Sequence, residues 1–212
     1  MADRFPGYDV LSKYGGESWN PPTRAAIDER LAMRDDADLL DPRRRATLRA
    51  LADRIVPQPE GRPPVNAAAL VLAKIAEDGS DGYRPAGFPR TGEAWTRGLD
   101  ALEAEALARA GASFADMDGS ALDRLLTGVE RGEVQADWHG LDPQSFWKYR
   151  IIPDLLAAYW AHPSAWSAMG FGGPASPRGY VRLGANQRDP WEAAEAGDGA
   201  ALPAPIRNAH VR

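Results

Sequence analysis

The stretch GLDPQSFWKYRIIPDLLAAYWAHP, residues 140–163, predicts the architecture of the chain. Asp142-Pro143 is typical of a helix start, because the aspartate side chain can accept hydrogen bonds from the first backbone N–H groups and proline fits the first helical turn. Apolar residues follow and lead to Pro153, which we expect to kink the helix or to split it in two. The second part is strongly apolar and ends before Pro163.

The same start signals recur upstream. Asn20 precedes Pro21-Pro22, Asp41 precedes Pro42, and Asn66 precedes an alanine-rich run, so each is expected to open a helix. No segment shows the period-2 alternation of a strand. We therefore predict an all-α fold of about six or seven helices.

Two further helices are predicted between these starts. One runs from about residue 92 to 110, with Gly111 as its stop. Its inward side chains are expected to be Trp95, Leu99, Leu102 and Leu107. The other opens at Ser120, which with Asp123 resembles a capping box, and closes at Gly132.

Outside the helices, the sequence predicts two arms around a body: an N-terminal arm at 1–20, a helical body at 21–164 and an irregular C-terminal arm at 165–212. The first arm carries aromatic and aliphatic residues without period, so we expect it to pack on its own body or on a partner. The second is rich in proline and glycine, with 191–196 as its one candidate helix beyond a single turn. Both arms are long for one domain, which favours wrapping of a partner.

Composition excludes several classes of protein. The net charge of -5 argues against a nucleic-acid binder, and cysteine is absent, which excludes disulfides and thiolate sites. No run reaches the roughly 18 apolar residues of a membrane span. Residues 1–16 lack an apolar leader core, so we expect a cytoplasmic location; a partner with its own export signal would instead carry the chain to the periplasm.

The segment GFGGPASPRGY, residues 170–180, invites comparison with a nucleotide-binding loop. A dinucleotide fingerprint needs a preceding strand and a following helix, and here Pro174 and Pro177 remove amide donors. A structural loop is the better interpretation, so we expect no cofactor in this chain.

Catalytic and metal sites are not indicated either. His139, His162 and His210 form no ligand pair, no serine elbow exists, and the Glu103–Glu105 carboxylates are read as a solvated helix face. His162 is expected to cap a helix end or lie at an interface. We predict no catalytic and no metal-binding residue, and a subunit or adaptor more than an enzyme.

Three segments carry a family resemblance: LRALADRIVPQ (48–58), GLDALEAEALARAGASFADM (98–117) and AYWAHPSAWSAMGFGGPASPRGYV (158–181). With them the chain resembles the gluconate 2-dehydrogenase subunit 3 family. The resemblance implies a non-catalytic small subunit that stabilises a large FAD-binding dehydrogenase of the glucose-methanol-choline (GMC) type. FAD, the catalytic base and the pocket for a sugar, glycoside or other alcohol would lie in that partner, and a cytochrome is a candidate electron acceptor.

The residues expected to contact the partner lie in the C-terminal arm. They are Trp166, Gly170, Phe171, Gly172, Gly173, Pro174, Arg178, Tyr180 and Trp191. Aromatic and arginine side chains are the usual anchors of protein interfaces. The alternative is a free-standing helical chaperone or interaction module that releases its client.

Overall fold

The computed structural model describes residues 4–36, 38–78, 82–177, 179 and 192–193. Helices dominate this part of the chain, and it holds no β-strand, only an isolated parallel bridge between Trp19 and Ser176. The predicted all-α class is confirmed, with seven helical segments if the continuous run 143–160 counts as one.

The chain divides into two units, which are described separately. The bundle unit contains residues 33–57 and 66–159, and the arm unit contains residues 1–32, 58–65 and 160–212, as far as they are described. The arm unit therefore joins segments from both ends of the chain and a short internal connector.

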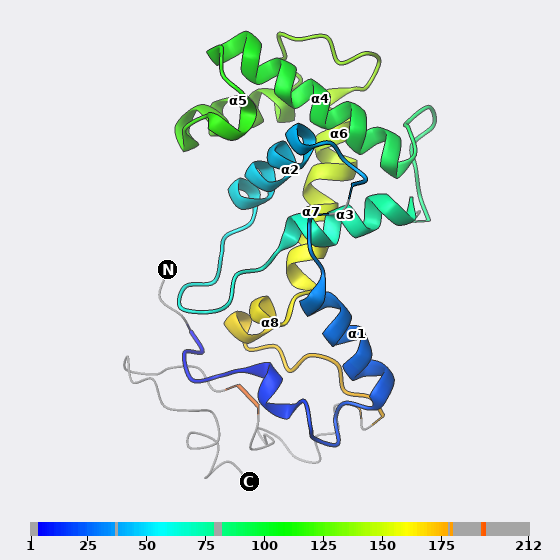
Figure 1. Cartoon of the computed structure of the whole chain (residues 1–212), viewed down its shortest axis with the longest axis vertical. Helices are drawn as coiled ribbons and strands as arrows, with labels where there is room; N and C mark the ends of the chain where they lie inside the picture. Colours follow the sequence, from blue (N-terminus) through cyan, green and yellow to red (C-terminus); the bar gives the residue numbers. More distant parts are fainter. Residues whose placement is uncertain (1–3, 37, 79–81, 178, 180–191, 194–212) are drawn as a thin grey trace. The chain divides into compact units, whose positions relative to one another are not determined.

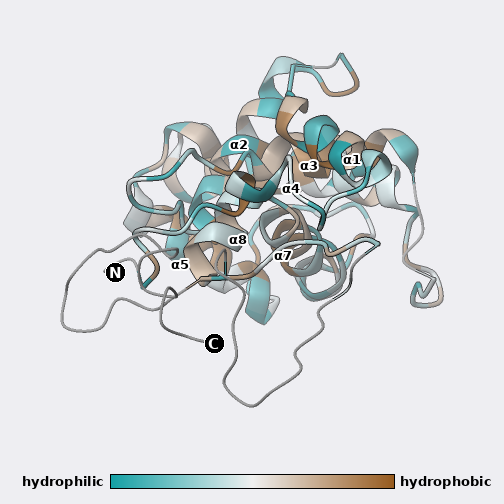
Figure 2. Cartoon of the chain, turned by 90° about the horizontal axis from the view of Figure 1, so that it is seen from below, coloured by the Kyte–Doolittle hydropathy of each residue, from teal (hydrophilic) through white to brown (hydrophobic). Residues whose placement is uncertain are grey.

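The bundle unit contains most of the helices in Figure 1. They are α2 (Pro42–Ile55), α3 (Ala67–Glu77), α4 (Thr91–Ala110), the 3₁₀ turn η2 (Phe114–Asp116), α5 (Gly119–Arg131), α6 (Pro143–Phe146) and α7 (Ile152–Trp160). α4 is the longest and contacts α2, α3, α5 and α6. Figure 2 shows hydrophobic residues predominating along α7.

Helix starts in the bundle follow the predicted chemistry. The side chains of Asp41, Asn66 and Asp142 each accept a hydrogen bond from the backbone N–H three residues ahead. Gly111 and Gly132 end their helices in the left-handed conformation. The start of α5 differs from prediction, because Asp118 rather than Ser120 is its cap.

Pro153 disturbs the 143–160 run as expected. The turn before it, Trp147–Ile151, is π-helical, and the N–H of Ile152 bonds the carbonyl of Trp147, five residues back. Proline cannot donate a backbone bond, and a π turn is a recurrent way to shift the ladder around such a break. The run is thus locally widened instead of being split.

Two predictions about α4 side chains are wrong. Leu107 is 52% exposed, whereas Trp95, Leu99 and Leu102 are fully buried as expected. Glu103 and Glu105 are buried, not solvated. Glu105 accepts bonds from the N–H groups of Gln135 and Ala136 and from Arg109. Burial raises its pKa, but these hydrogen bonds outweigh burial and hold the pKa below its usual value.

A second buried carboxylate, Asp154 on α7, also organises the bundle. Its oxygens accept bonds from Lys74 Nζ and Trp95 Nε1, both at 2.8 Å, and Arg150 lies one helical turn away at 3.4 Å. A buried charge needs such partners, because an isolated ion would be strongly destabilised inside a protein. Asp154 thereby links α3, α4 and α7.

The arm unit is built from η1 (Val10–Lys13), α1 (Pro21–Ala32), the connector 58–65, α8 (Pro163–Met169) and the loop that follows. Asn20 caps α1 as predicted. Its core is small and aromatic: Tyr8, Val10, Trp19, Ile27 and Trp166 are buried together.

The predicted division into 1–20, 21–164 and 165–212 differs from the observed one. α1 groups with the arms, and the border at 164/165 falls inside α8. The C-terminal arm therefore begins as a helix, contrary to the prediction of an irregular segment from residue 165. The N-terminal arm packs on its own chain, one of the two outcomes expected for it.

Candidate partner-binding surface

The glycine-rich segment predicted to bind a partner lies beside the N-terminal arm (Figure 1). The N–H of Asn20 donates to the carbonyl of Ser176, and the N–H of Ser176 donates to that of Ser18, both at 2.8 Å. Trp19 Nε1 donates to the Pro174 carbonyl at 2.7 Å. Segments about 155 residues apart are thus joined by backbone and side-chain bonds.

Two glycines make this packing possible. Gly170, with φ +73°, ends α8, and a Cβ there would lie 2.6 Å from the Phe5 ring. Gly173, with φ +65°, lies against Val10, Trp166 and Trp19, and a Cβ would meet each of them at 3.1–3.3 Å. Only glycine combines the positive φ with such close contacts.

Trp166 belongs to the buried core of the arm unit and does not lie on its surface. It is 4% exposed, its Nε1 donates to the Trp160 carbonyl, and the Arg30 guanidinium lies 6.0 Å from its ring centroid. Its ring meets that of Phe171 edge-on at 5.9 Å. Trp166 therefore supports the ring of Phe171 within the arm unit.

Three large apolar side chains before, in and after α8 are exposed: Trp160, the last residue of α7, at 46%, Met169, the last residue of α8, at 43%, and Phe171, in the loop that follows, at 41%. We call them the α8 apolar set. They lie in residues 155–177, a stretch without a single Asp, Glu, Lys or Arg. The core of a protein interface is typically enriched in Trp, Met and Phe and depleted of charged residues.

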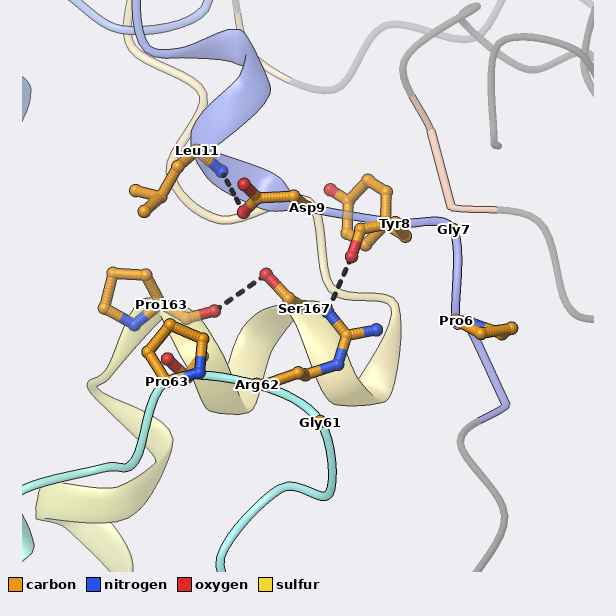
Figure 3. Close-up of a pocket in the computed structure, with 11 residues that line it drawn as sticks. Pro6, Gly7, Tyr8, Asp9, Leu11, Gly61, Arg62, Pro63, Pro163 and Ser167 are labelled. Atoms are coloured by element: carbon orange, nitrogen blue, oxygen red, sulfur yellow. Dashed lines mark hydrogen bonds between the residues drawn. The ribbon is translucent and has the colours of Figure 1, made fainter. Parts of the chain in front are cut away.

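A pocket of about 300 Å³ opens beside α8 (Figure 3). Its walls come from residues 6–9 and 11 of the N-terminal arm, residues 61–63 of the connector, and Pro163, Ser164 and Ser167 of α8. Arg62 fixes the connector to the arm by donating to the carbonyls of Tyr8 and Phe5, at 2.7 and 2.6 Å. The pocket is thus formed entirely within the arm unit.

The hydroxyl of Ser167 joins α8, which forms one wall of the pocket, to the N-terminal arm. It accepts a bond from the N–H of Val10 and donates to the carbonyl of Pro163, both at 3.0 Å. The Tyr8 hydroxyl donates to the carbonyl of Phe171 at 3.3 Å. Tyr8 therefore connects the pocket to the α8 apolar set.

His162 caps α8, consistent with the prediction that it lies at a helix end. Its Nδ1 accepts a bond from the N–H of Ser164 at 3.2 Å, which requires the unprotonated nitrogen. Burial lowers the pKa of His162, because the charged imidazolium is poorly solvated there.

The remaining predicted contact residues divide into two groups. Gly172 and Pro174 are partly buried in the same loop. Arg178, Tyr180, Trp191 and all of the candidate helix 191–196 except residues 192 and 193 lie outside the described residues. Sequence reasoning did not single out Met169, although the charge-free stretch around it was visible.

Other kinds of site were sought in the described ranges. No group of three or more His, Asp or Glu side chains there could hold a metal ion. None of the helices described has the length and apolar run needed to cross a bilayer.

Comparison with known proteins gave one family. The family model described as gluconate 2-dehydrogenase subunit 3 matches residues 42–173, from the first residue of α2 to Gly173. Searches of curated proteins and of solved structures returned no significant match. The matched span includes the bundle, α8 and the α8 apolar set but not the N-terminal arm.

Proposed function

The chain belongs to the gluconate 2-dehydrogenase subunit 3 family, and we propose that it is a non-catalytic small subunit that binds and stabilises a large FAD-dependent dehydrogenase of the GMC type. The family match over residues 42–173 carries this proposal. The α8 apolar set supports it, since exposed Trp, Met and Phe within one charge-free stretch are typical of a surface covered by another protein.

The chemistry of the complex would reside in the large subunit. FAD there would accept a hydride from an alcohol carbon of a sugar, a glycoside or a related alcohol, and a cytochrome is one candidate acceptor for its electrons. The small subunit contributes by mass action, because it binds the folded large subunit and not the unfolded chain. We propose the cytoplasm as its location, or the periplasm if the large subunit carries an export signal.

Co-expression with a GMC-type FAD-binding dehydrogenase from the same genome, chosen as the candidate large subunit, tests the proposal. Size-exclusion chromatography with flavin absorbance should show both chains in one yellow peak at equal stoichiometry. The large subunit expressed alone should have a lower melting temperature or be insoluble. Elution of this chain by itself, apart from a stable flavoprotein, would contradict the proposal.

The same experiment separates a permanent subunit from a chaperone. A chaperone would raise the yield of the flavoprotein and then elute apart from it. A subunit stays bound through dilution, and its removal lowers the stability of the flavoprotein.

A further inference from the structure

The pocket beside α8 has a chemistry that limits what can occupy it. Much of its wall is carbon, from Pro6, Leu11, Pro63 and Pro163. Three of these four are prolines, which have no backbone N–H to offer a ligand. These four residues therefore offer a polar molecule little to bond. The polar side chains of the wall are Tyr8, Asp9, Arg62, Ser164 and Ser167.

The strongest polar groups of the wall already bond within the chain. Ser167 uses its hydroxyl both as acceptor and as donor, and Arg62 directs two of its nitrogens at backbone carbonyls. One oxygen of the Asp9 carboxylate accepts a bond from the N–H of Leu11. A polar ligand would have to break these bonds, at a cost comparable to what it gained. An apolar group needs no such partner and gains by leaving water.

The volume of the pocket points to a single side chain. About 300 Å³ is at the lower limit of small-molecule sites, so a dinucleotide such as FAD does not fit. The apolar side chains that anchor interfaces are of the right size, and they fill pockets of this kind at the centres of protein interfaces.

The pocket and the α8 apolar set are formed by the same segments of the chain. Tyr8 lines the pocket and donates to the carbonyl of Phe171. Pro163 and Ser167 belong to the charge-free stretch 155–177 that carries Trp160, Met169 and Phe171. A partner that contacts α8 and its loop would therefore meet both the pocket and these exposed residues.

We propose that this pocket receives one large apolar side chain of the dehydrogenase large subunit, which anchors the complex. The inference rests on the proposed function, because it specifies how the large subunit is held. A second copy of this chain, or an apolar small molecule, is the competing occupant.

The first test fills the pocket. Pro63 is exposed and lines the pocket, so Pro63→Trp should occupy it without disturbing the core. We expect the dissociation constant for the large subunit to rise by about 30-fold or more, the loss expected for a hot-spot contact. Pro63→Ala is the matched control and should change it less than about threefold, which separates blockage of the pocket from loss of the proline ring.

The outcomes distinguish the two proposals. If the wild-type chain does not bind the large subunit, the proposed function fails. If it binds, and Pro63→Trp binds equally well while folded, the pocket inference is overturned and the proposed function stands. If Pro63→Trp binds the large subunit at wild-type strength but no longer self-associates as the wild-type chain does, the pocket belongs to a second copy. That result also overturns the inference.

A second measurement does not depend on how the tryptophan folds. Because the chain has no cysteine, Pro63→Cys introduces a unique thiol, whose maleimide labelling is read from the mass of this chain. In the complex we expect labelling to slow at least about tenfold, as for a site opened only by dissociation. Leu107→Cys, on the exposed face of α4, is the control and should label at the same rate free and bound. Equal labelling of the Pro63→Cys thiol free and bound overturns the inference.

Discussion

The bundle unit and the arm unit are stabilised by different kinds of contact. In the bundle, helices begin and end at local caps, and buried carboxylates join them. In the arm unit, five buried residues form the core, and bonds between segments about 155 residues apart fix it. The bundle therefore depends on local caps and on its buried charged groups, whereas the arm unit depends on two distant pieces of chain meeting correctly.

The largest effect is expected in the bundle. Asp154→Ala leaves Arg150 buried without its carboxylate, and we expect a loss of about 3–5 kcal/mol of unfolding free energy. Urea unfolding followed by circular dichroism measures it. Asp123→Ala, which removes an exposed partner of Arg54, should cost no more than about 1 kcal/mol. Equal losses would contradict the role given to Asp154.

Glycine substitutions compare the two units directly. Gly173→Ala should destabilise the arm unit by about 2–3 kcal/mol, since it adds strain at positive φ to crowding against Val10 and Trp19. Gly111→Ala, also at positive φ but with nothing within 4 Å, should cost only about 1 kcal/mol. Hydrogen exchange should show the first change in residues 8–19 and the second in α4. If the two variants had the same pattern of hydrogen exchange, Gly173 would not be what keeps residues 8–19 packed.

Trp19→Phe removes one bond between the arms. The carbonyl of Pro174 loses its donor, and we expect a loss of about 1–2 kcal/mol confined to the arm unit. Faster amide exchange in residues 8–19 and 165–177, with α2 to α5 unchanged, is the expected pattern. Uniform acceleration across both units would break the distinction between them.

Lowering the pH should reduce the stability of the arm unit, because His162 becomes protonated. Its pKa is lower in the folded chain than its ordinary value of 6.5, so its contribution to stability is complete above that pH. The contribution is lost as pH falls through the lower, folded pKa, because the unfolded chain then binds the proton more readily. His162→Asn keeps an acceptor at the cap and should remove this pH dependence from exchange in α8. An unchanged dependence would assign it to another group.

The same contrast explains what sequence could predict. Asp41, Asn66 and Asp142 cap the helices that begin directly after them, so a local sequence pattern was enough to identify them. Burial of Glu105 depends on donors of the loop at 135–136, about 30 residues away, and no local signal indicated it. α8 is only seven residues long, and the pairing of Trp19 with Pro174 spans nearly the whole chain. Composition suggested a partner surface, but only the fold separated buried Trp166 from exposed Phe171.

The central claim is that the arm unit binds the large subunit through α8 and the loop that follows it. The most direct measurement is the dissociation constant of the complex for Phe171→Asp and Leu107→Asp, two exposed apolar positions, one in each unit. The account predicts a rise of about 30-fold or more for Phe171→Asp and less than about threefold for Leu107→Asp. Equal weakening, or a larger effect at Leu107, would contradict it.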